Sequence, residues 1–189
     1  MAENNPLTNN LDHELLDGRV IFLEDNVDTD SVNKVMKELM VLQKRNKRKP
    51  IHLMINSPGG SIYDMFALYD AIQTSKCPVH TYAFGMAMSA AAIILLSGTK
   101  GCRYASENSR IMLHELSEWT ESDTRERFSD SKVRIEESDK LMKMILNVIR
   151  KHTKIQVTDT ELLKRLEKDL YISSHTAKEM GVIDHVIRN

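Results

Sequence analysis

One serine lies where the backbone could support chemistry. Ser89 belongs to Gly85-Met-Ala-Met-Ser-Ala-Ala-Ala-Ile-Ile-Leu-Leu-Ser-Gly98, a stretch of mostly small or apolar residues. Gly85 predicts a turn from a strand into a helix, so the Ser89 side chain can face a cleft. The first N–H groups of a helix lack partners within it and can face a developing negative charge. The structural alternative is a serine that hydrogen-bonds to a preceding helix carbonyl.

A nucleophilic serine needs a base, and His114 is the best placed of the seven histidines. It ends the apolar segment Ile111–Leu113, and a strand can present a histidine at its tip. The alternative is a buried histidine with satisfied hydrogen bonds. His52 and His80 lie inside predicted strands and are expected to be structural. The remaining four are expected to be exposed or peripheral: His13, His152, His175 and His185.

A third group must orient the base, and Asp169 is the candidate. It follows a predicted helix and leads into the apolar segment Leu170-Tyr-Ile172, so its carboxylate is expected to be partly buried. The alternative, a solvated aspartate at a helix end, is disfavoured because the helix macrodipole repels an anion at the C-terminus. These three residues form the candidate Ser-His-Asp triad.

The segment Ser57-Pro-Gly-Gly60 adds a possible backbone donor. A Pro-Gly turn between a strand and a helix is ordinary in itself. A second glycine permits a positive φ and lets the backbone approach a ligand. The Gly60 N–H could therefore point into a site, although a simple tight turn is the alternative.

Strands alternate with helices along the chain, which predicts one α/β domain with largely parallel pairing. Apolar runs predict strands at 20–23, 51–55, 79–84, 111–114 and 170–172. A helix capped by Asp30 is expected to bury Val32, Val35, Met36, Leu39 and Met40. A long charged helix follows from about 124 to 151, and Thr158–Glu161 is a capping box. Residues 1–14 are predicted to be a flexible polar tail, and 15–189 a single domain.

Composition excludes several classes of function. The 189 residues are 41% hydrophobic and 28% charged, with a net charge of −1, so neither nucleic acid nor a membrane is an expected partner. The basic run Lys44–Lys49 is interpreted as a solvated helix end. Cys77 and Cys102 lack zinc-site spacing, and no signal-type apolar segment opens the chain. Together these features favour a cytoplasmic location and no metal.

Taken together, ordered motifs resemble the ClpP family, the proteolytic subunits of the Clp protease. The resemblance runs from about Leu15 to Ile187. The motifs are Ile55-Asn-Ser-Pro-Gly-Gly-Ser61, Tyr69-Asp-Ala-Ile72, Gly85-Met-Ala-Met-Ser89, Ser97-Gly-Thr-Lys-Gly-Cys-Arg-Tyr-Ala105, Asn108-Ser-Arg-Ile-Met-Leu-His114 and Met180-Gly-Val-Ile-Asp184.

The resemblance implies a serine endopeptidase with Ser89 as nucleophile, His114 as base and Asp169 as orienting acid. Gly60 and Ala90 would supply the two oxyanion-hole N–H groups. The implied fold is a ClpP/crotonase-like spiral of ββα units with a protruding handle helix at about 120–152. The implied particle stacks two heptameric rings into a tetradecamer that cleaves unfolded polypeptides. No cofactor is implied, because ATP would be used only by an AAA+ unfoldase partner.

Three departures from the family pattern suggest a divergent member, such as a phage or accessory copy. Ala90 stands where the family usually has Met, Glu115 where it has Gln before a Pro, and Leu170 where it often has Arg. Three other functions stay open: a non-catalytic subunit of a mixed ring, a phage capsid maturation protease and a crotonase-type acyl-CoA enzyme.

Overall fold

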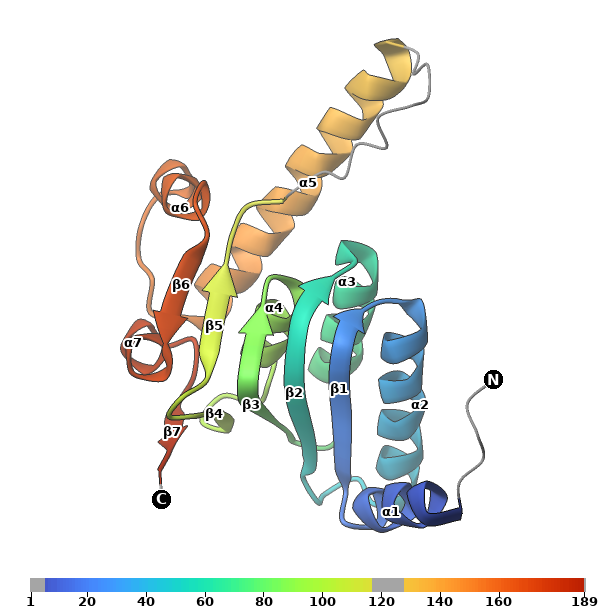
Figure 1. The fold of residues 1–189 in the computed structure, drawn as a ribbon. Coiled ribbons are helices and arrows are strands. Elements are labelled where there is room, and N and C mark those ends of the chain that lie inside the picture. The colour runs from blue at the N-terminus through green and yellow to red at the C-terminus, as the bar shows by residue number, and fades with distance from the viewer. Residues whose placement is uncertain (1–5, 117–127, 189) are drawn as a thin grey trace.

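A largely parallel sheet of seven strands forms the centre of the molecule (Figure 1). The structure is a computed structural model, and it describes residues 6–116 and 128–188. The strands are β1 Val20–Val27, β2 Ile51–Gly60, β3 Val79–Met88, β4 Arg103–Ser106, β5 Arg110–Leu113, β6 Leu170–Ser173 and β7 His185–Ile187. The helices are α1 Pro6–Asp17, α2 Thr29–Arg45, α3 Ile62–Gln73, α4 Ala90–Leu96, α5 Phe128–His152, α6 Asp159–Leu166 and α7 Ser174–Met180. The predicted α/β class is confirmed.

Strand β3 pairs with two different strands along the same edge. The order is β1-β2-β3-β4-β7, and β5 also pairs with β3. The first part of β3 pairs with β4 through residues 81–83, and its last part pairs with β5 through residues 86–88. Among these pairs only β5–β6 is antiparallel. The end of β5 therefore lies beside the end of β3, where Ser89 follows.

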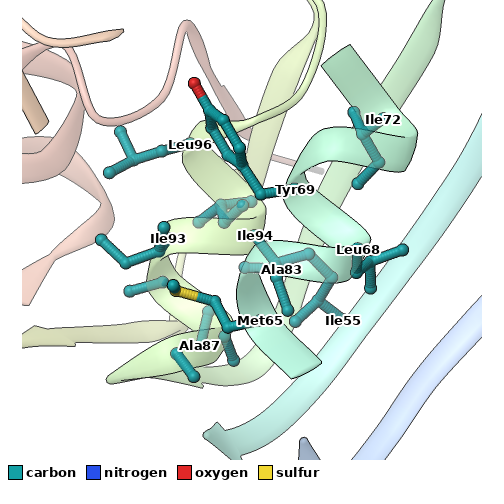
Figure 2. Packing of buried hydrophobic residues seen from close by; sticks show 14 of the residues in the cluster. Ile55, Met65, Leu68, Tyr69, Ile72, Ala83, Ala87, Ile93, Ile94 and Leu96 are labelled. Atoms are coloured by element: carbon teal, nitrogen blue, oxygen red, sulfur yellow. The ribbon is translucent and has the colours of Figure 1, made fainter. Parts of the chain in front are cut away.

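The core lies between the sheet and helices α2, α3 and α4. Alternate residues of β2, Ile51, Leu53 and Ile55, are fully buried. Every residue of α4 is buried, and its side chains meet those of α3 (Figure 2). Burying one such aliphatic side chain contributes about 1.5–3 kcal/mol, so this packing holds the α4 backbone firmly in place.

Helix α2 differs from its prediction at both the cap and the buried face. Its N-cap is Asp28, whose side chain accepts a hydrogen bond from the Ser31 N–H, rather than Asp30. The side chain of Met40 is 67% exposed, and Leu42 is buried instead. Both corrections follow because β1 runs on to Val27, which fixes where the helix starts and which way it turns toward the sheet.

The structure also bears on the predicted N-terminal tail and the predicted handle helix. Residues 6–14, expected in a flexible tail, lie in α1, whose Leu16 packs against the core; residues 1–5 lie outside the described part. The expected handle helix is present as α5 over 128–152, while 120–127 lie outside the described residues. The first part of α5 projects from the body, and its second part is packed into it (Figure 1).

Candidate active site

Ser89 forms the sharp turn between β3 and α4. The predicted turn from strand to helix near Ser89 is present, but its predicted position at Gly85 is wrong: β3 continues to Met88 and α4 begins at Ala90. Ser89 has φ 52° and ψ −123°, a conformation that non-glycine residues rarely adopt. Its N–H donates to the Met112 carbonyl at 2.8 Å. The parallel pairing with β5 therefore holds the strained turn in place.

Gly59 permits β2 to approach this turn. The strand β2 runs to Gly60, whereas the sequence predicted that it ends at Ile55. Gly59 has φ 98°, and a Cβ atom there would lie 2.8 Å from Ser89 Cβ and 3.0 Å from the Ala90 nitrogen. Only glycine fits both the backbone angle and the space. This role of Gly59 was not predicted, since only Gly60 was expected to matter, although the two adjacent glycines were a signal for it.

His114 contacts Ser89 directly. Its Nε2 lies 2.7 Å from the Ser89 Oγ, within hydrogen-bond distance. The geometry follows from strand register, because Met88 on β3 pairs with Met112 on β5. Ser89 and His114 are the residues that leave these two parallel strands at the same edge of the sheet. The tertiary structure thus brings together the predicted nucleophile and base.

Asp169 lies next to His114 but does not reach it. On antiparallel β6, Leu170 pairs with Leu113, so Asp169 comes opposite His114. Its Oδ1 is 4.0 Å from His114 Nδ1, longer than a hydrogen bond, and its side chain is 55% exposed. The expectation of a partly buried carboxylate is therefore corrected: the α6–β6 connection holds Asp169 at the surface.

A cavity of about 420 Å³ opens beside these groups. Four of the predicted site residues line it: Gly60, Ser89, Ala90 and His114. Its other lining residues are Ser61, Ile62, Met65, Ile93, Leu113, Glu115, Leu116, Ile145 and Ile149. An apolar hollow that exposes a serine–histidine pair suits binding of a side chain next to a reacting carbonyl.

The other histidines with notable contacts lie away from Ser89. His152, predicted to be exposed or peripheral, is instead partly buried, with its Nε2 3.0 Å from the Tyr69 hydroxyl. On β2, His52 Nδ1 is 2.9 Å from the Tyr82 hydroxyl, and the rings of His52 and His80 meet edge to face. Burial lowers the pKa of both imidazoles. The part of the chain that the structure describes contains no group of three His, Cys, Asp or Glu side chains that could hold a metal. Within the same residues, no helix is long and apolar enough to cross a bilayer.

Comparisons with known proteins identify the family of this chain. The family model for Clp protease matches residues 3–189. The chain is 34% identical to ATP-dependent Clp protease proteolytic subunit 1 of Rhodopirellula baltica over 173 residues, which are 92% of this chain and 74% of that protein. It is 36% identical to the ATP-dependent Clp protease proteolytic subunits of Deinococcus radiodurans and Bdellovibrio bacteriovorus, covering 92% and 93% of this chain and 82% and 81% of theirs. This chain therefore belongs to the Clp protease family, a family of serine-type peptidases.

Proposed function

We propose that this chain is a serine endopeptidase for unfolded polypeptides, with residues 15–189 acting as one peptidase domain. Ser89 would be the nucleophile, His114 the general base and Asp169 the residue that orients the imidazole. The observation that carries this proposal is the 2.7 Å contact between His114 Nε2 and Ser89 Oγ at the mouth of an apolar cavity. A base within hydrogen-bond reach of a hydroxyl can remove its proton during attack.

The proposed reaction has two steps. His114 Nε2 takes the Ser89 proton as Oγ attacks a peptide carbonyl, and the same imidazolium then protonates the leaving amine. Water, activated by His114, hydrolyses the resulting acyl-enzyme and restores the serine. No metal or organic cofactor takes part in this chemistry.

The Gly60 and Ala90 N–H groups are proposed to stabilise the tetrahedral oxyanion. Both residues line the cavity with Ser89. The Ala90 N–H belongs to the first residue of α4, where helix N–H groups have no acceptor within the helix. Since backbone donors are independent of the side chain, alanine at position 90 keeps this function.

The particle is proposed to be a cytoplasmic homo-oligomer of two stacked heptameric rings that receives substrate from an AAA+ unfoldase. The relatives are named as proteolytic subunits of an ATP-dependent protease, which supports a multi-subunit particle. We propose that the unfoldase, and not this chain, uses the ATP. Exposed apolar side chains on α5 suit contacts between subunits; they are Val133, Ile135 and Met144. Neither nucleic acid nor a membrane is a proposed partner.

One observation favours a second candidate, a non-catalytic subunit of a mixed ring. Asp169 is exposed and lies 4.0 Å from His114, so the hydrogen bond that would fix the imidazole is missing. A shift of about 1 Å would complete it. Labelling by a fluorophosphonate probe separates the two functions, since an activated Ser89 reacts with the probe and an inert one does not.

Substitution of Ser89 tests the proposal. Ser89→Ala should lower kcat/KM for a denatured polypeptide and for short peptides by about a thousandfold or more, with unchanged thermal unfolding, because the nucleophile is lost and the fold is not. Ser75→Ala, in the loop before β3, is the matched control and should keep wild-type activity. Equal turnover by wild type and Ser89→Ala would end the proposal.

A further inference from the structure

The reaction cavity combines an apolar wall with one carboxylate. Its wall is built by α3, α4 and α5 through Met65, Ile93, Ile145 and Ile149. Among the described residues that line the cavity, only Glu115 has a carboxyl side chain, and none is a lysine or an arginine. The cavity is thus suited to a side chain with an apolar stem, and its charge preference depends on Glu115.

Glu115 is fixed at this position by its backbone. It directly follows His114, and its N–H donates to the Leu166 carbonyl at the end of α6 at 2.9 Å. Its side chain is exposed, and no cation in the described part of the chain forms an ion pair with it. The carboxylate is therefore available to a bound substrate.

Other charged side chains lie near Glu115. Glu115 also lines a neighbouring hollow of about 340 Å³, where Asp139 and Lys143 contribute opposite charges. Asp169 adds a second exposed carboxylate beside His114. A cationic substrate group near the cavity mouth would be attracted, and an anionic one repelled.

We propose that Glu115 sets a charge preference at the residue whose carbonyl Ser89 attacks, favouring Lys or Arg over Glu or Asp. This inference rests on the proposed function. If Ser89 attacks a peptide carbonyl, the side chain of the substrate residue that carries this carbonyl enters the cavity beside Ser89. The methylene stem of Lys or Arg packs on the apolar wall formed by Met65 and Ile93, and the cation reaches the Glu115 carboxylate. Glu115 is in this view a specificity-determining residue, not a catalytic one.

Fluorogenic peptide amides test the proposal on the full-length protein as assembled. The peptides are blocked at the N-terminus and differ only in the residue before the cleaved bond, which is Lys, Gln or Glu. For each protein we take the ratio of kcat/KM for the Lys peptide to kcat/KM for the Glu peptide. We expect this ratio to be about three- to tenfold larger in wild type than in Glu115→Gln. The excess should shrink as salt rises, because Glu115 is exposed and is screened by ions.

Two further variants sharpen the test. Glu115→Lys should reverse the preference relative to Glu115→Gln, so that the Glu peptide gains and the Lys peptide loses. Glu107→Gln is the matched control, since it removes the same charge at the turn between β4 and β5, before the other end of β5. It should keep the wild-type ratio.

The outcomes separate this inference from the proposed function. Cleavage that depends on Ser89 but shows the same Lys to Glu ratio in wild type, Glu115→Gln and Glu115→Lys would overturn the charge preference alone. If no peptide is cleaved in a way that depends on Ser89, both the charge preference and the proposed function are overturned. If Glu107→Gln changes the Lys to Glu ratio as much as Glu115→Gln does, the preference comes from the overall charge of the protein. That result would also refute the role of Glu115.

Discussion

At the scale of single residues, the geometry of the candidate site depends on strain at Ser89. A non-glycine residue held at a rare φ and ψ costs about 1–3 kcal/mol, which its surroundings must offset. The hydrogen bond from the Ser89 N–H to the Met112 carbonyl and the burial of α4 provide that support. The strain lifts the Ser89 hydroxyl out of the helix and toward His114.

The close approach of Gly59 to Ser89 gives a prediction for this turn. Gly59→Ala would place a methyl group against Ser89 and the Met88 carbonyl, so the turn must shift. We expect kcat/KM to fall at least about tenfold, because a displacement of about 1 Å in a catalytic group is costly. Peptide hydrolysis and thermal unfolding measure the two effects.

Gly101→Ala is the matched control. Gly101 also has a positive φ, 87°, but a Cβ atom there would meet nothing within 4 Å. It should lose about 1 kcal/mol of stability from backbone strain and keep its activity. If both variants lose activity equally, the contact between Gly59 and Ser89 is not what positions the nucleophile.

At the scale of elements, the base of α5 is tied to the sheet by a polar cluster around His152. His152 Nε2 lies 3.0 Å from the Tyr69 hydroxyl on α3. The buried Arg103 on β4 donates from Nη1 to the His152 carbonyl and forms a bidentate pair with Asp184. Removing one partner of a fully buried ion pair costs about 3–5 kcal/mol, and the cost is smaller here because Asp184 is partly exposed. This cluster anchors the helix whose apolar residues line the cavity.

The His152 side chain makes stability depend on pH. Burial, with Lys151 and Arg103 nearby, lowers the pKa of His152 to about 4. The unfolded chain binds a proton at a pKa near 6.5, so the folded state loses relative stability as the pH falls from about 6.5 to about 4. After allowance for solvent screening we expect this histidine to contribute about 1 kcal/mol of that loss.

Denaturant unfolding at pH 7 and pH 4.5 measures this contribution. His152→Gln should lose less stability between the two values than wild type, because glutamine does not titrate. Parallel pH profiles for the two proteins would show that the imidazole is protonated as easily in the fold as outside it.

At the scale of the whole molecule, the projecting part of α5 is unusual for an isolated chain. Val133 and Ile135 are 65% and 59% exposed, whereas Ile145 and Ile149 on the same helix are buried. Apolar side chains on a projecting helix favour association, because burial removes them from water. The stacked rings proposed above would cover them.

Particle mass tests this arrangement. Analytical ultracentrifugation should give a wild-type species near fourteen times the 21.7 kDa chain mass. Ile135→Glu should shift it toward seven times that mass, because a charge in an apolar contact between rings is unfavourable. Lys132→Glu changes charge at a neighbouring exposed position and should leave the particle intact. A monomeric wild type at micromolar concentration would contradict the proposed assembly.

The sequence by itself determined the order of most elements, with α1 and β4 as exceptions, and named the serine and histidine that meet at the site. Local signals were sufficient where the cause is local: the Thr158 side chain caps α6 by accepting a hydrogen bond from the Glu161 N–H, as predicted. Ser89 and His114 could be named because each follows an apolar strand and carries a reactive side chain.

The tertiary structure decided the rest, because it depends on pairing between distant segments. Strand β4, which sequence analysis missed, is a four-residue segment that pairs with β3 and β7. The turn lies at Ser89, and not at Gly85 as predicted, because pairing with β5 extends β3 by several residues. The distance from Asp169 to His114 depends on where the β5–β6 register leaves the carboxylate, and spacing along the chain contains no information about that register.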